Sequence, residues 1–381
     1  MINLDYASHT PASEAVLEEF CRVERECAGN ALSAHGLGRA AHAELTRATE
    51  GIASLLNVKP QEIIYTSGAS EANNMAIKGI ANAYAHMGKH ILSSCLEHPS
   101  VSGTLTYLAE KGWEIELLKI QPNGKIDTTH LKSAIRPDTV LICTNAVDSE
   151  LGAIQDFVFL TKSGQALQTC HMSGLFPLLH VDYAQAMGKV NLPLPGDFST
   201  LCFSPHKFYG LGGFGVLVKR EGVVLEPLIH GGTSSAQTLY RAGTPSPAHA
   251  AACYTALKIA LADREKNLKT VQELREYVIK KLPDTVKINS PPDGSPYILN
   301  LSTDNIKGRE MQSKLNDRGI AISVKSACST DNAPSRPVFA ITGEKKRALN
   351  SWRLSFSHLT KKQELDVFIS EICYNADIKH Q

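Results

Sequence analysis

Two polar turns that follow apolar runs carry a lysine and an aspartate that could act together. Lys207 closes the turn Ser-Pro-His-Lys at 204–207, after the apolar run 198–203 and before a glycine-rich return. Asp182 closes the apolar run 178–182, twenty-five residues earlier. Pyridoxal phosphate needs a lysine amine for its Schiff base and a carboxylate for its ring nitrogen. A lone lysine is usually a solvated surface charge, but this pairing predicts a pyridoxal-phosphate site.

A turn of small residues could bind the phosphate of that cofactor. The stretch Thr-Ser-Gly-Ala-Ser at 66–70 precedes a predicted helix, and the amides at a helix N-terminus attract anions. An ordinary N-cap without a ligand is the alternative interpretation of this turn. Two further donors lie beside the predicted Schiff-base lysine. The predicted phosphate-binding residues are Gly68, Ala69, Ser70, Ser204 and His206.

Three more side chains are suited to catalysis or substrate binding. His98 follows a predicted strand and could lie over the cofactor ring or move protons, although a lone histidine is more often structural. Cys328 lies in a loop of small polar residues, where it is either a nucleophile or an incidental surface cysteine. Arg353 lies inside a strand-like run, where an arginine usually pairs with a carboxylate, often that of a ligand.

Predicted strands and helices would position these residues at one edge of a sheet. Apolar spacing predicts helices within 13–57, and from residue 61 short strands alternate with helices, one of them near 157–167. This alternation predicts an α/β fold with a mostly parallel sheet covered on both faces. Ligands then bind at the carboxyl ends of the strands. The residues that fall just after predicted strands are Gly68, His98, Asp148, Asp182 and Lys207.

The last third of the chain predicts a second, smaller domain. A long helical region covers 247–282 and has an apolar stripe. From Tyr297 on, the pattern is strand, helix, strand, loop, strand and helix. This order indicates an α+β domain appended to the larger α/β one.

The composition argues against several classes of function. Lys plus Arg number 39 and Asp plus Glu 38, so no basic surface for nucleic acid or membrane is indicated. No apolar run is long enough to span a bilayer, and no secretory signal is recognisable. The nine cysteines are scattered without the spacing of a metal site, which suits a reducing compartment. We therefore expect a cytoplasmic protein without a metal and without direct contact to nucleic acid or membrane.

These motifs resemble those of a cysteine desulfurase of the class V aminotransferase family, a group of fold type I pyridoxal-phosphate enzymes. The similarity covers nearly the whole chain and points to the longer-loop subgroup, typified by the nitrogenase-associated and housekeeping iron–sulfur desulfurases. The matching segments are 4–7, 66–71, 97–98, 180–185, 204–207, 241–244, 326–328 and Arg353. The resemblance implies a large domain at 13–258 with a mostly parallel sheet of the seven-stranded type. A small domain, formed by 1–12 and 259–381, would carry the cysteine loop.

The resemblance also implies roles for single residues. His98 would stack on the ring and, with the Schiff-base lysine, move protons, and Gln185 would lie near the phenolic oxygen. Thr244 would complete the phosphate site of the neighbouring subunit in a homodimer. Arg353 would bind the substrate carboxylate, and Cys328 would carry a persulfide. The implied reaction converts L-cysteine to L-alanine and passes the sulfur to an acceptor protein, such as an iron–sulfur scaffold or a thiolation enzyme.

One turn departs from the family pattern. The family's Asn-Asn-Glu-x-Gly is Asp-Ser-Glu-Leu-Gly at 148–152 in this chain, which places Asp148 where an asparagine would face the cofactor and the substrate carboxylate. An ionised Asp148 cannot donate a hydrogen bond and would repel both, so it is protonated, turned away, or a cause of weak activity. Two alternatives remain. One is another class V enzyme that works without Cys328, either an aminotransferase or a β-lyase acting on cysteine or selenocysteine. The other is a cofactor-binding scaffold that lost turnover through Asp148.

Overall fold

The computed structural model describes residues 1–156, 177–192, 198–232, 236–325 and 333–377. Within these residues, the largest layer is a seven-stranded sheet of order β2-β8-β7-β6-β5-β3-β4. Its neighbouring strands are parallel, except that β8 runs antiparallel to β2 and β7. This sheet confirms the predicted α/β class. The strands are β2 (Ile63–Thr66), β3 (His90–Ser94), β4 (Glu114–Leu118), β5 (Thr139–Asn145), β6 (Leu178–Asp182), β7 (Thr200–Phe203) and β8 (Gly215–Lys219).

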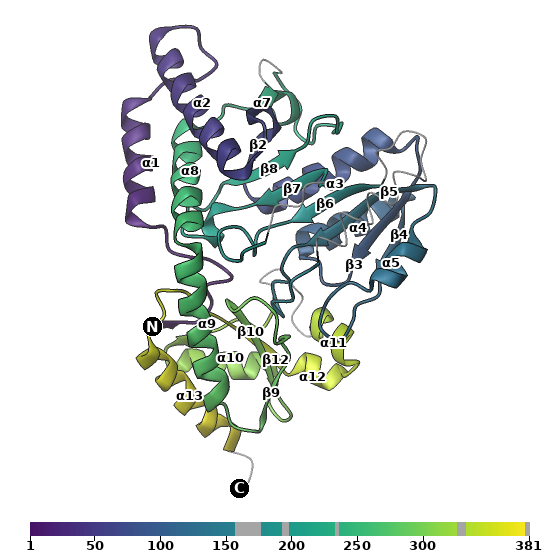
Figure 1. Cartoon of the computed structure of the whole chain (residues 1–381), viewed down its shortest axis with the longest axis vertical. Helices are drawn as coiled ribbons and strands as arrows, with labels where there is room; N and C mark the ends of the chain where they lie inside the picture. The colour runs from purple at the N-terminus through teal and green to yellow at the C-terminus, as the bar shows by residue number, and fades with distance from the viewer. Residues whose placement is uncertain (157–176, 193–197, 233–235, 326–332, 378–381) are drawn as a thin grey trace.

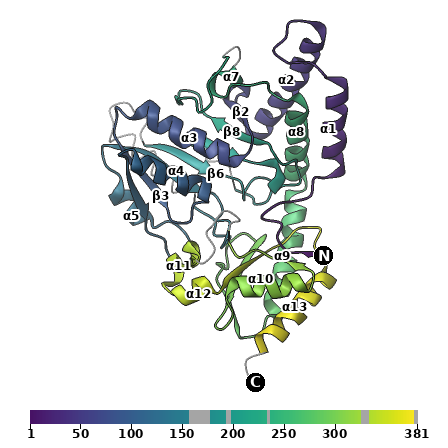
Figure 2. The ribbon, with the colours of Figure 1, turned by 180° about the vertical axis from the view of Figure 1, so that it is seen from behind.

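Helices cover both faces of this sheet, as its apolar strands require. On β5, Ile142 packs into the core beneath α1, α2 and α8, whereas Leu141 and Cys143 pack into the core beneath α3 and α4. Helices α1, α2 and α8 lie on the left in Figure 1, and α3 and α4 lie nearer the viewer in Figure 2. The helices are α1 (Glu14–Glu26), α2 (Gly36–Leu56), α3 (Ala69–Tyr84), α4 (Pro99–Glu110), α5 (Thr128–Ala134) and α8 (Pro247–Ala262).

A second core lies in the lower part of Figure 1, around a three-stranded antiparallel sheet of order β12-β10-β9. The N-terminal strand β1 belongs to this part, because it pairs in parallel with β11, and Leu4 is fully buried beside Trp352 and Phe368. The elements are β1 (Ile2–Asn3), α9 (Arg264–Lys281), β9 (Val286–Ile288), β10 (Ile298–Thr303), α10 (Gly308–Asp317), β11 (Ile320–Ala321), α11 (Arg336–Thr342), α12 (Lys345–Leu349), β12 (Ser351–Ser355) and α13 (Lys362–Asp377).

The two cores are joined by α8 and α9, which follow one another down the left side of Figure 1. The helical region predicted at 247–282 is thus two helices, and Asp263 lies between them. The domain boundaries at residues 12 and 258 stay a prediction, and the helix predicted near 157–167 lies outside the described residues. Among the described residues, no helix is both long and apolar enough to cross a membrane.

Candidate active site

The carboxyl ends of the sheet strands surround a cavity of about 370 Å³. β2, β3, β5, β6 and β7 each lead into a segment that contributes to its wall, and β12 of the smaller sheet contributes from the opposite side. The parallel order of the strands brings these ends together. Of the residues predicted from the sequence, the wall contains Gly68, Ala69, Ser70, His98, Asp182, Gln185, His206, Lys207 and Arg353.

The predicted phosphate turn lies at the N-terminus of α3. β2 ends at Thr66 and the helix begins at Ala69, and the residues of this turn, 67–70, contribute to the cavity wall, while the Ser67 amide donates to the Glu71 carboxylate at 2.7 Å. Gly215 on β8 crosses directly behind it, where an added Cβ would lie 2.5 Å from the carbonyl carbon of Gly68. Only a glycine lets the two backbones approach this closely. The turn is therefore held in place by its contact with β8.

Lys207 reaches the cavity from a short 3-10 helix, Pro205–Lys207, that follows β7. Its Nζ donates to the carbonyl oxygens of Ala7, at 2.9 Å, and Ser8, at 2.7 Å. Gln185 donates from Nε2 to the same Ala7 oxygen at 2.9 Å, and its Oε1 accepts from Nζ of the buried Lys189 at 3.0 Å. The N-terminal segment thus forms one wall of the site and binds the amine predicted to hold the cofactor.

Asp182 ends β6, and the residue is 7% exposed. Oδ1 accepts from the amide of Ala184, and Oδ2 accepts from Nδ2 of Asn73, both at 2.9 Å. A carboxylate held by two donors at the cavity wall suits the ring nitrogen of a pyridinium cofactor. This placement agrees with the role predicted for it.

His98 is the N-cap of α4, and its ring forms part of the cavity wall. Its Nδ1 accepts from the amide of Ser100 at 3.1 Å and lies 2.8 Å from the Ser100 hydroxyl. Burial lowers the pKa of His98, and Asp182 partly opposes that shift. The imidazole is therefore neutral at pH 7, with Nδ1 used as an acceptor.

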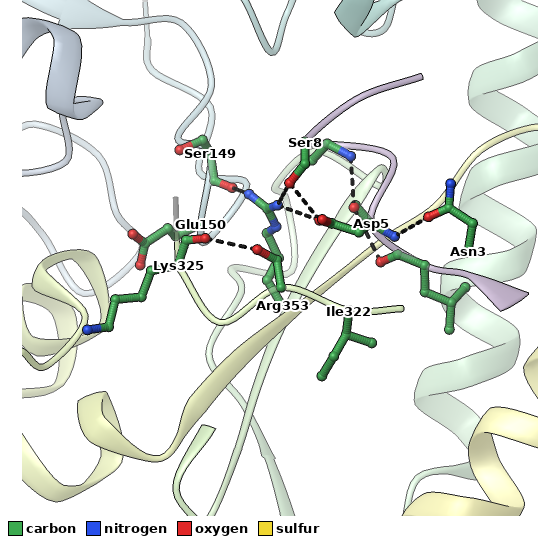
Figure 3. A network of polar contacts seen from close by, with 12 residues as sticks. Asn3, Asp5, Ser8, Ser149, Glu150, Ile322, Lys325 and Arg353 are labelled. Carbon is green, nitrogen blue, oxygen red and sulfur yellow. Dashed lines mark hydrogen bonds and ion pairs between the residues drawn. The ribbon is translucent and has the colours of Figure 1, made fainter. Parts of the chain in front are cut away.

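Arg353 lies on β12 and is 2% exposed. Figure 3 shows its guanidinium between Ser149 on one side and the N-terminal segment on the other. Nη1 donates to the Ser149 carbonyl at 2.7 Å, and Nη2 donates to Oδ1 of Asp5 at 2.7 Å and to the Ser8 hydroxyl at 2.9 Å. A fixed guanidinium at the wall of a cavity is suited to binding a carboxylate.

The structure does not bring Asp148 to the cavity wall. Its Oδ1 accepts from the amides of Glu150, at 3.1 Å, and of Leu151, as a cap of its own turn. Its Oδ2 is buried and has no hydrogen-bond partner among the described residues. Burial, reinforced by Glu150, raises the pKa of Asp148 to about 7. Its contacts to the turn agree with the turned-away state among the three predicted, and its pKa makes the protonated form accessible near neutral pH.

Three other predicted residues also lie away from the wall or outside the described chain. Ser204 is fully buried and donates to the Phe214 carbonyl at 2.7 Å, while its oxygen lies 2.8 Å from Nδ1 of His206. It therefore supports His206 rather than opening onto the cavity. Thr244 contributes to a neighbouring hollow of about 180 Å³, and its contribution to a second subunit stays a prediction. Cys328 lies outside the described residues.

Sequence reasoning missed several residues of the site. Ser8, Ser100, Asn145 and Ser149 contribute to the cavity wall, and Asn73 lies buried behind it with 0% exposure. A signal for Asn73 exists in the sequence, since it is a polar residue on the face of α3 that otherwise carries buried apolar side chains. Buried polar groups need partners, so such a position indicates a hydrogen-bond network.

Comparison with known proteins agrees with this fold and site. The family described as aminotransferase class-V matches residues 2–368. A cysteine desulfurase IscS of Dictyoglomus turgidum is 34% identical over 373 residues, which cover 96% of this chain and 92% of that protein. A NifS/IcsS protein homolog of Lactobacillus delbrueckii subsp. bulgaricus is 33% identical, covering 97% of this chain and 96% of that protein.

Solved structures show the same relationship. A NifS-like protein superposes with a TM-score of 0.89 at 28% identity and covers 99% of both chains. A structure of SspA in complex with cysteine has a TM-score of 0.81 at 28% identity, covering 93% of this chain and 99% of that one. The match of the family over almost all of the sequence means that this chain belongs to the class-V aminotransferase family.

Proposed function

We propose that this protein is a pyridoxal-phosphate-dependent cysteine desulfurase, which converts L-cysteine to L-alanine and passes the sulfur on as a protein-bound persulfide. The observation that carries the proposal is a single cavity in which Lys207, Asp182, His98 and Arg353 meet. An amine, a carboxylate and an imidazole suit the cofactor, and the guanidinium suits the carboxylate of an amino acid. Relatives along the full length of the chain are named cysteine desulfurase.

The residues present fit pyridoxal phosphate. The cavity, of about 370 Å³, is in the size range of small-molecule sites. The amides and hydroxyl of Gly68, Ala69 and Ser70 at the N-terminus of α3 suit the phosphate, and Asp182 suits the ring nitrogen. The amine of Lys207 would bond to the aldehyde carbon in place of its contacts to the backbone. The cofactor supplies the electron sink for bond breaking at the substrate.

Each residue then has a defined task in the proposed reaction. Arg353 holds the carboxylate of L-cysteine, and the amine of Lys207 and the ring of His98 are the groups within the cavity that can move protons. The Cys328 thiolate forms a bond to the substrate sulfur while the carbon–sulfur bond breaks. L-Cysteine and the enzyme thiol thereby become L-alanine and an enzyme persulfide, with no other reactant needed.

The proposal includes the setting in which this reaction takes place. We place the protein in the cytoplasm as a homodimer whose segment around Thr244 completes the partner's phosphate site. Free cysteines throughout the described residues suit a reducing compartment. The sulfur acceptor would be another protein, such as an iron–sulfur scaffold or a thiolation enzyme. The bonds of Asp148 to its own turn argue against the alternative of a weakened scaffold, which depended on a carboxylate facing the cofactor.

Turnover of ³⁵S-labelled L-cysteine tests the proposal. The full-length protein with pyridoxal phosphate should form alanine and carry ³⁵S that a reductant releases. Cys328→Ser should still bind the cofactor but hold almost no labelled sulfur, and Lys207→Ala should lose the visible absorption band. Cys21→Ser, at an exposed cysteine on α1, is the matched control and should behave as wild type. If Cys328→Ser still carries and transfers the label, or frees sulfide as fast as wild type, the lyase alternative replaces the desulfurase.

A further inference from the structure

A buried asparagine connects the aspartate and the histidine of the proposed site. Nδ2 of Asn73 lies 2.9 Å from Oδ2 of Asp182 and 2.8 Å from the Ser100 hydroxyl. Its Oδ1 lies 2.8 Å from Nε2 of His180 and 2.8 Å from Sγ of Cys202. A primary amide has two N–H donors and two acceptor lone pairs. Asn73 therefore uses its full hydrogen-bonding capacity at this point of the fold.

The donors and acceptors in this network have one consistent direction. The Asp182 carboxylate only accepts, so the Asn73 nitrogen must face it, and the same NH₂ group donates to the Ser100 oxygen. The Ser100 hydroxyl hydrogen is then left for Nδ1 of His98, 2.8 Å away, which also accepts from the Ser100 amide. With Nδ1 occupied by two donors, the proton of the neutral His98 ring is on Nε2.

The direction of the hydrogen bonds at the Asn73 side-chain oxygen is also determined. Because Oδ1 of Asn73 can only accept, Nε2 of His180 donates to it, and Nδ1 of His180 accepts from the Thr200 hydroxyl at 2.9 Å. Burial lowers the pKa of His180 to about 4, so this ring stays neutral and keeps the single N–H that the network needs. The network is closed without a mismatched pair.

We propose that Asn73 is a positioning residue that orients Asp182 and, through Ser100, His98 at the same time. Asn73 supplies one of the two hydrogen bonds that hold the Asp182 carboxylate. It also forces the Ser100 hydroxyl toward Nδ1, which leaves the Nε2–H of His98 as a donor. The role of Asp182 toward a cofactor rests on the proposed function, whereas the orientation of the His98 ring does not.

The consequence for catalysis concerns the direction of proton movement. In this state His98 can donate a hydrogen bond from Nε2 but cannot accept a proton there. The first proton taken from a bound amino acid must then go to a group other than His98. The amine of Lys207, which also lies at the cavity wall, can take it. His98 would then act toward a bound ligand as a hydrogen-bond donor and not as the base.

Cofactor binding to variants of the full-length protein tests the role toward Asp182. Asn73→Ala should weaken the affinity for pyridoxal phosphate by about tenfold or more, because a buried hydrogen bond to a charged group is lost. The same substitution should also shift the pH at which the visible absorption band of the bound pyridoxal phosphate changes its wavelength. Asn82→Ala, the same change at an exposed position of α3, should leave both properties as in wild type. Circular dichroism checks that each variant is folded.

A second variant separates positioning from packing. Asn73→Asp keeps the volume, and its carboxyl group can donate to Asp182 only while it is protonated. The titratable groups that surround it are Asp182, His180, Cys202 and, through Ser100, His98. Cofactor affinity of Asn73→Asp should therefore fall steeply as the pH rises, whereas that of Asn73→Ala should remain weak at every pH.

The state of His98 has its own measurement, which needs no turnover. NMR spectra of protein with ¹⁵N-labelled histidine measure this state. The His98 signals, identified by their absence in His98→Gln, should show Nδ1 without a proton and Nε2 with one. Ser100→Ala should alter those signals, because Nδ1 of His98 then loses its hydroxyl donor. Suppose that wild type binds pyridoxal phosphate and that both Asn73 variants match it in cofactor affinity, in the visible absorption band and in the pH dependence of the affinity. The inference is then wrong while the proposed function stands. If wild type binds no pyridoxal phosphate, the proposed function itself fails.

Discussion

Replacing Asp148 by asparagine should make the protein more stable at alkaline pH. The carboxylate has one oxygen capped by two amides and the other buried without a partner among the described residues. Burial and Glu150 raise its pKa to about 7, whereas an unfolded aspartate has a pKa of about 3.9. An asparagine keeps an acceptor for the two amides and has no charge to bury.

The sign and size of the effect follow from this difference in pKa. Between pH 4 and 7 the folded protein holds a proton on Asp148 that the unfolded chain has released. Its contribution to stability is therefore fully present below pH 4 and is lost as the pH rises toward 7. At about 1.4 kcal/mol per pKa unit, the wild type loses roughly 4 kcal/mol over this range. Between pH 5 and 8 the loss is about 2.5 kcal/mol, and Asp148→Asn avoids it.

Urea unfolding of wild type and Asp148→Asn at pH 5 and pH 8 measures the effect. Burying the new NH₂ group costs about 1–3 kcal/mol at both pH values. The informative quantity is therefore how much the difference in unfolding free energy between Asp148→Asn and wild type changes from pH 5 to pH 8. Asp127→Asn is the matched control, since Asp127 accepts from the amides of Thr129 and His130 in the same capping pattern but at a more exposed position. If the advantage of Asp148→Asn is equal at both pH values, Asp148 is not a buried acid and the reasoning fails.

Two further predictions concern the framework of the site. Burial raises the pKa of Glu97 to about 8, and its Oε1 accepts from the amide of Asn145 at 3.0 Å. In urea unfolding at pH 7, Glu97→Gln should lose less stability than Glu97→Ala, which leaves that amide without its acceptor and should lose about 2–4 kcal/mol; equal losses would contradict a protonated side chain. Gly215→Ala should weaken pyridoxal-phosphate binding in a spectroscopic titration, because its Cβ would meet Gly68 at 2.5 Å. Gly103→Ala, which meets nothing within 4 Å on α4, should leave binding unchanged and add about 0.5–1 kcal/mol of stability.

Residues that act where a strand ends could be predicted from the sequence. Lys207, Asp182 and His98 each follow an apolar run, and the alternation of strands and helices already implies that these ends lie together. The structure confirms the sheet and brings the three side chains to one cavity. The break between α8 and α9 was not predicted, because neither a proline nor a glycine marks the end of α8 before Asp263.

The fold class, the strand ends and the residue types placed there could thus be predicted, since these depend on local periodicity. The partners of those residues, in contrast, depend on how distant segments pack in three dimensions. Arg353 meets Asp5 across 348 positions of sequence, and Asn73 meets Asp182 across 109. Asp148 is placed by burial, which local sequence does not report. Hydrogen bonds between distant segments depend on how helices and sheets pack together, and the burial that this packing produces also sets the pKa values of the groups inside.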